Sequence, residues 1–150
     1  MAVNMSNEPG NGVIGPAVLT HGTMEARAKE SARTIYEQIL GLRCVNTSKV
    51  SQLVAGGGNV AVVCVQAGST VHPQGEENRW IVLADSDSAV ADVHAAADKG
   101  EGIAILRPIE SSDGISSFIM QDIDGNWWEI TNRPVSHYQD IFERGDVVAA

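Results

Sequence analysis

The sequence is poor in cysteine and in basic residues, and it contains no long apolar run. Its two cysteines are too few for a disulfide framework. Ten lysine and arginine residues stand against nineteen aspartate and glutamate residues, so the net charge is −9, the wrong sign for binding nucleic acid or an anionic membrane surface. No apolar stretch reaches the roughly 18 residues of a membrane span, and no basic and then apolar leader opens the sequence. We therefore expect a cytoplasmic protein that binds neither nucleic acid nor membranes.

The composition is that of one globular domain. The 150 residues are 43% apolar and 19% charged, and a chain of this length can bury a sizeable core. Cys44 and Cys64 lie in apolar, strand-like surroundings, where we expect them to pack as reduced thiols.

Apolar periodicity predicts two similar series of elements, each with one strand, one helix and three further strands. The first helix, Met24 to Leu40, has apolar residues three and four positions apart. The second, Ser86 to Lys99, has Ser86 or Ser88 as its N-cap. Pro108 is expected to end the strand before it. The strands are expected over residues 16–22, 42–46, 52–55 and 59–65, and then over residues 79–84, 102–107, 115–120 and 127–130.

The repeat predicts an α+β fold of two βαβββ modules, which form a curled mixed sheet, a pair of half-barrels, around a cleft. The modules cover about residues 16–66 and 78–132 of a domain over residues 16–133. Residues 1–15 are expected to form a flexible N-terminal arm. Residues 134–150 are expected to form a C-terminal tail that can pack over a site or a neighbouring subunit.

One carboxylate is unusual for its position. Asp124 and Gly125, between two apolar runs, predict a tight type I′ turn, and in the strand that follows Trp127 and Glu129 point to the same face. Burying Glu129 unpaired would cost several kcal/mol. It therefore needs a cation, a metal ion or a proton, unless it faces solvent or pairs with an arginine.

Three segments resemble the vicinal oxygen chelate superfamily of glyoxalases, bleomycin-resistance proteins and extradiol dioxygenases. His21 opens the first module. Residues 32–42, ARTIYEQILGL, resemble the family's "FYxxxLGL" helix. Residues 122–129, DIDGNWWE, resemble its "DPDGNxxE", with Ile123 in place of the usual proline. The resemblance spans about residues 18–146.

The resemblance implies a cleft around one divalent metal ion, Fe(II), Mn(II), Zn(II) or Ni(II), with His21 and Glu129 as ligands. The family's second histidine is missing. Its place falls on Asn78, Arg79 or Trp80, and we favour Asn78, because it would share a strand face with Trp80.

Other residues are candidates for the remaining positions of the site. A fourth position used by some members of the family falls on Cys64 or Gln66. His72, in a loop, or His137, in the tail of this chain or of a partner, could replace the missing ligand. Alternatively, the site has lost its metal, and His21 and Glu129 form an acid/base pair.

Three hypotheses for function follow. The first is a metal-dependent enzyme, dioxygenase-like or glyoxalase-like, that acts on an oxygen-rich or aromatic metabolite, with His72 or Tyr138 as general acid/base. The second is a metal-free isomerase, lyase or cyclase. The third is a binding protein that sequesters its ligand. The residues expected to contact the small molecule are Asn78, Trp80, Trp127 and Cys64. We also expect a homodimer, because relatives of this size commonly pair.

Overall fold

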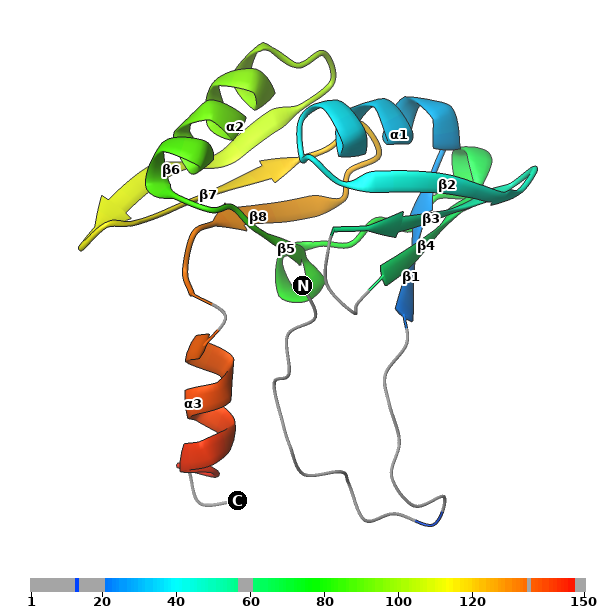
Figure 1. The fold of residues 1–150 in the computed structure, drawn as a ribbon. Helices are drawn as coiled ribbons and strands as arrows, with labels where there is room; N and C mark the ends of the chain where they lie inside the picture. The colour runs from blue at the N-terminus through cyan, green and yellow to red at the C-terminus, as the bar shows by residue number, and fades with distance from the viewer. Residues whose placement is uncertain (1–12, 14–20, 57–60, 135, 148–150) are drawn as a thin grey trace.

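The structure is a computed structural model and describes residues 13, 21–56, 61–134 and 136–147, without the side chains of residues 61 and 136–139. Two modules follow one another and are joined through two short 3₁₀ turns (Figure 1). The first consists of β1 (His21–Ala26), α1 (Lys29–Gln38), β2 (Arg43–Ser48), β3 (Ser51–Ala55) and β4 (Ala61–Gln66). The second consists of β5 (Trp80–Leu83), α2 (Asp87–Lys99), β6 (Ala104–Ser112), β7 (Ile115–Gln121) and β8 (Trp127–Thr131). Helix α3 (Ser136–Arg144) follows them.

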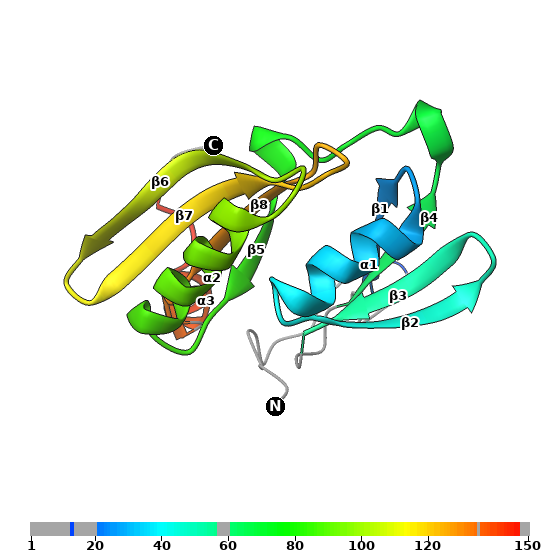
Figure 2. The same ribbon diagram turned by 90° about the horizontal axis from the view of Figure 1, so that it is seen from above.

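Each module forms its own four-stranded mixed sheet. The strand orders are β1-β4-β3-β2 and β5-β8-β7-β6, so β1 and β5 are edge strands in equivalent places. Each of these edge strands runs parallel to its neighbour, while the other pairs are antiparallel. Seen from above, the modules lie side by side (Figure 2). This arrangement confirms the predicted α+β fold with two βαβββ modules.

The first strand extends farther than predicted, and the first helix begins later. Residues 16–20 of the expected strand over residues 16–22 lie outside the described residues, and β1 covers His21–Ala26. Helix α1 starts at Lys29, not at Met24. Met24 and Ala26 are strand residues because they pair with Cys64 and Gln66 of β4. This tertiary pairing overrides the helical propensity of the local sequence.

Pro108 does not end its strand. Strand β6 runs from Ala104 to Ser112, straight through the proline. It is the outer strand of its sheet, and its register shifts between Arg107 and Glu110. An edge strand with a bulge tolerates a residue without an N–H group.

The predicted type I′ turn is also in a different place. Gly125 has a positive φ of 88°, but Asp124 does not, and the loop from Asp122 to Asn126 is closed by an Asp122 N–H to Asn126 O hydrogen bond. Both central residues have positive φ at Asp113 and Gly114, 54° and 78°, between β6 and β7. An Asp-Gly pair does form a type I′ turn in this module, but it is Asp113-Gly114 and not Asp124-Gly125.

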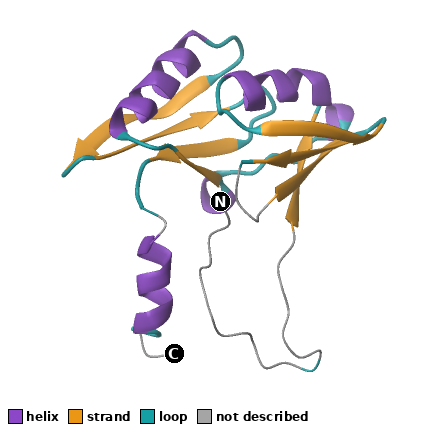
Figure 3. Cartoon of the chain, in the orientation of Figure 1, coloured by secondary structure: helices purple, strands orange, loops and turns teal. Residues whose placement is uncertain are grey.

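Each sheet has one face packed on its helix, and among the described residues no helix lies across its other face (Figure 1). Both α1 and α2 lie on the same side of the sheets (Figure 3). The shared core includes Met24, Tyr36, Cys64, Phe118, Trp128 and Ile130. We call the opposite side of the two sheets the open face. Among the described residues, no helix is long and apolar enough to cross a membrane.

Candidate functional site

Strand alternation determines which side chains reach the open face. In β8, Trp128 and Ile130 are buried in the core, so Trp127 and Glu129 point to the open face. The pairing register places Glu129 in a row across the sheet, opposite Ile81 of β5 and Ile119 of β7. A carboxylate between two isoleucines requires a compensating charge.

That charge comes from Arg79. Its Nε and Nη2 donate hydrogen bonds of 3.0 and 2.8 Å to Oε1 of Glu129, and its Nη1 donates to the carbonyl oxygen of Glu76 at 2.7 Å. Both charged side chains are partly shielded, with 29% and 20% of their surfaces exposed. A guanidinium keeps its positive charge throughout the physiological pH range. The cation beside Glu129 is therefore a residue of the chain itself.

Arg79, and not the favoured Asn78, lies on the face that carries Glu129. Trp80 and Val82 pack against the core, so the residues of β5 that share the open face are Ile81 and, just before the strand, the extended Arg79. The Oδ1 of Asn78 instead accepts the N–H of Gly75 at 2.7 Å.

His21 lies at the boundary between the two modules. Its neighbour Gly22 lies against the indole of Trp80, and a Cβ on that glycine would be 3.2 Å from the ring. A side chain at this position would require the indole to shift by a few tenths of an ångström. His21 is exposed and alternates with the buried Met24, which places it on the open face, one residue from the contact with β5.

Two other predicted residues have surroundings of their own. Cys64 is completely buried in the core, and burial raises the pKa of its thiol, so its position does not support the predicted contact with a small molecule. Val63, the preceding residue of β4, points to the opposite face. His72 is highly exposed, and its Nδ1 lies 3.2 Å from Oε1 of Glu25. His21 and Glu25 are at opposite ends of β1, about 13 Å apart along an extended chain.

The two tryptophans predicted to contact a small molecule, Trp80 and Trp127, lie on different faces. Trp128 and Trp80 pack in the core, whereas Trp127 is half-buried on the open face. The side chains of Tyr138 and His137 lie outside the described residues, so the roles predicted for them stay predictions.

The loop from Asp122 to Asn126 connects the two modules. Oδ1 of Asp124 accepts the backbone N–H of Arg27 at 2.8 Å. Nδ2 of Asn126 donates to the carbonyl oxygen of Glu25 at 2.9 Å, and its Oδ1 accepts the N–H of Gln74 at 2.7 Å. The segment that resembles the family's DPDGN motif thus fixes the end of β1 relative to the start of β8, which carries Glu129.

Asp122 gives this loop a pH dependence. Burial raises its pKa to about 6, although hydrogen bonds from Trp128 and from the backbone of Asp124 and Asn126 act in the opposite direction. Since the folded-state pKa lies above the ordinary value, this group contributes stability that is present at low pH and lost as the pH rises from about 4 to about 6.

We expect replacement of Asp122 by asparagine to remove this contribution. The stability of the variant relative to the wild type should be higher at pH 7 than at pH 4.5, with a change of up to about 2 kcal/mol between the two conditions. Urea unfolding of both proteins at the two pH values measures it. A difference that stays constant, or changes in the opposite direction, would contradict the burial of an ionised carboxylate at this position.

The residues of the open face do not fit the predicted metal ion. Within the described part of the chain, no three His, Cys, Asp or Glu side chains lie close enough together to hold one. Glu129 is already bonded to Arg79, whose guanidinium has no lone pair to donate and would repel a cation. A metal bound by Glu129 would first have to displace Arg79.

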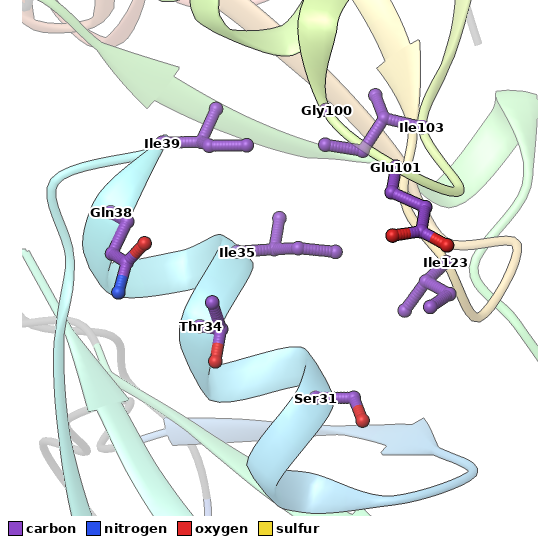
Figure 4. Close-up of a pocket in the computed structure, with 9 residues that line it drawn as sticks. All are labelled: Ser31, Thr34, Ile35, Gln38, Ile39, Gly100, Glu101, Ile103 and Ile123. Atoms are coloured by element: carbon purple, nitrogen blue, oxygen red, sulfur yellow. The ribbon is translucent and has the colours of Figure 1, made fainter.

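A separate groove of about 360 Å³ lies on the helix side of the molecule. Figure 4 shows Ile35 and Ile39 of α1 on one wall and Ile103 and Ile123 on the other. Glu101 is the only acidic or basic residue that lines it. The groove therefore lacks the pair of opposite charges found at Glu129.

Comparison with known proteins gives a likeness in fold. No family model and no curated protein matches the sequence. A glyoxalase/bleomycin resistance protein from Albidiferax ferrireducens matches with a TM-score of 0.63 and 18% identity over 77% of this chain and 98% of that one. The oxidase ChaP-H1 matches with a TM-score of 0.62 and 21% identity over 79% and 97%. The fosfomycin resistance protein FosX from Mesorhizobium loti matches with a TM-score of 0.62 and 20% identity over 80% and 95%.

Proposed function

Because the chain has the vicinal oxygen chelate fold, we propose that it binds a small, oxygen-rich or aromatic molecule on its open face without a metal ion. Arg79 is the cation of this site. The observation that carries the proposal is the ion pair in which Arg79 Nη2 and Glu129 Oε1 are 2.8 Å apart. In the family that the sequence resembles, the strand equivalent to β8, which here carries Glu129, provides a metal ligand.

An arginine can perform part of what a divalent metal does in such a site. Its planar, charged group binds carbonyl, enolate, carboxylate or phosphate oxygens through directed hydrogen bonds. A ligand oxygen that approaches Glu129 therefore meets a positive charge. A metal-free isomerase or lyase fits these residues best.

The chemistry we propose is proton transfer next to a carbonyl group. Glu129 removes a proton from the carbon beside the carbonyl, and the C–H electron pair moves onto the carbonyl oxygen to form an enolate. Arg79 stabilises that negative charge. Return of the proton to a different atom gives an isomer, and loss of a leaving group from the neighbouring carbon gives an elimination product. His21, on the same face, is the second candidate for proton transfer.

One observation favours sequestration as a second candidate. Trp127 is half-buried on the open face, beside the strand position of Glu129, and an indole there can stack on an aromatic ligand. FosX is a resistance protein by its description, and a resistance-type role for this chain requires binding but no turnover.

The proposal is tested by a screen of α-hydroxycarbonyl and enolisable compounds. Tryptophan fluorescence measures binding, and product analysis measures turnover. Arg79→Gln should weaken binding by about 10- to 100-fold, the loss expected for a charge-assisted hydrogen bond. Arg107→Gln is the matched control, since Arg107 lies in the same row as Glu129 but two strands away. Equal affinity of the two variants would contradict the proposal.

Glu129→Gln separates the two candidate functions. If Glu129 is the base, turnover should fall by about 10²- to 10⁴-fold while ligand still quenches tryptophan fluorescence. Quenching without turnover in the wild type would support sequestration.

A further inference from the structure

The groove on the helix side of the molecule lies between the two modules, on the opposite side from the open face. Ile35 and Ile39, one turn apart on α1, form one wall, and Ile103 and Ile123 of the second module form the other (Figure 4). Its volume is about 360 Å³. Small-molecule sites have volumes of this order, are mostly apolar and often lie where two folded units meet. The groove therefore has the size and the lining of a small-molecule site.

Two glycines position an acidic residue at this groove. Gly100 and Gly102 flank Glu101 in the turn after α2. A Cβ on Gly100 would lie 2.5 Å from Cδ1 of Ile103, and a Cβ on Gly102 would lie 2.9 Å from Cγ1 of Ile123. Gly102 also has a φ of 79°, a conformation that favours glycine. The turn therefore packs closely on both isoleucines, and Figure 4 shows Glu101 between them.

The side chain of Ile123 is only partly covered by its own chain. It stands where the motif that the sequence resembles usually has proline, and 41% of it is exposed. Its backbone carbonyl accepts Nη1 of Arg27 at 3.0 Å, a bond that any side chain at this position allows. Because Ile123 lines the groove, an apolar ligand bound there would remove its exposed surface from water, which is favourable.

The charge of the groove favours a positively charged ligand. Among the described residues that line it, Glu101 is the only acidic or basic one. Arg27, which bonds the neighbouring loop, is paired with Asp124 at 3.7 Å. The net charge of −9 further favours cations over anions near the surface. An ammonium group can therefore pair with Glu101 while its apolar substituent covers the isoleucines.

We propose that this groove binds a small organic cation. The ligand is an amine whose ammonium group pairs with Glu101 and whose aliphatic or aromatic body lies between the isoleucines of α1 and those of the second module. The site is independent of the proposed chemistry, because it shares no residue with the open face. A ligand in this place contacts both modules.

Three probes with the same six-carbon chain but different charges test the site: hexylamine, 1-hexanol and hexanoate. Binding at pH 7 is followed in ¹H–¹⁵N NMR spectra of the labelled protein, where shifts of the Glu101 and Ile123 amides locate the ligand. We expect protonated hexylamine to bind about fivefold more tightly than 1-hexanol, the effect of one exposed ion pair, and hexanoate to bind most weakly. Equal affinities for hexylamine and 1-hexanol would indicate an uncharged occupant and would overturn the proposal. Shifts confined to the open face would also overturn it.

Substitutions separate the groove from the general negative charge of the protein. Glu101→Gln should lower the affinity for hexylamine to that for 1-hexanol and leave 1-hexanol binding unchanged. Glu110→Gln is the matched control, because it removes the same charge from an exposed residue outside the groove, and it should change no affinity. Ile123→Ala should weaken hexylamine and 1-hexanol by the same factor, since both use the same apolar wall.

Two results with these variants would contradict the proposed site. If Glu101→Gln and Glu110→Gln weakened hexylamine binding equally, the net charge of the protein and not the groove would attract the amine. If the Glu101 and Ile123 amides shifted when the protein alone was diluted, a second copy of the chain would cover the groove. Either result would overturn the proposal.

Discussion

Replacement of Trp128 by alanine is expected to destabilise the protein by about 4 kcal/mol, the loss typical of a buried tryptophan. Trp128 is 3% exposed, and its indole Nε1 donates to Oδ2 of Asp122 at 2.9 Å. Its ring centroid lies 5.4 Å from that of Tyr36. Because Tyr36 belongs to α1 and Trp128 to β8, this one side chain joins the cores of the two modules.

Trp127→Ala is the control for that prediction. The same ring type, on the next residue of the strand, is half-buried on the open face, so its loss should cost less than half as much. Urea unfolding at fixed protein concentration measures both variants. Equal losses would contradict the burial of Trp128 on the core face and the partial exposure of Trp127 on the open face.

Replacement of Asn126 by alanine is expected to cost about 3 kcal/mol, because it leaves two partly buried backbone groups without partners. Asn126 is completely buried and bonds Glu25 O and Gln74 N. The lost hydrogen bonds join the two modules, so the variant should weaken the contact between them. Hydrogen exchange at the N–H of Gln74 should therefore accelerate strongly.

The matched control for Asn126 is Asn132→Ala. Asn132 makes the same kinds of hydrogen bonds, but to Ser116 and Gly114 within one module, and its bond to Gly114 is exposed. It should cost less and leave exchange at Gln74 unchanged. If both variants accelerated exchange at Gln74 equally, the loop would not be a specific connection between the modules.

Most of the fold could be predicted because its signals are local. Apolar alternation and spacing located the strands and both helices, and Ser86 accepts the N–H of Ala89 as the N-cap of α2. The errors arose where distant residues decide. The segment from Met24 to Ala26 has helix-forming residues but pairs with β4, and Pro108 is tolerated because β6 has no outer neighbour.

The site could be predicted only in part for a related reason. Alternation correctly placed Trp127 and Glu129 on one face of β8. A shared strand face with Trp80 favoured Asn78 for the place of the missing histidine. The apolar character of Trp80 and Val82 was the signal for the opposite choice, since a face made of such residues packs in the core. Arg79, one residue later, then belongs to the open face.

Arg79 is proposed to take the place of a metal ion beside Glu129, and a metal titration measures whether it does. Apoprotein is titrated with Fe(II) under anaerobic conditions and with Mn(II), Zn(II) and Ni(II), and calorimetry monitors each titration. The metal that stays bound after gel filtration is then measured. The wild type should retain no stoichiometric metal. Arg79→His, which removes the competing charge and adds an imidazole donor beside Glu129, should gain metal affinity, and the double variant Arg79→His with Glu129→Gln should lose it again. Stoichiometric metal in the wild type, lost in Glu129→Gln, would contradict the account.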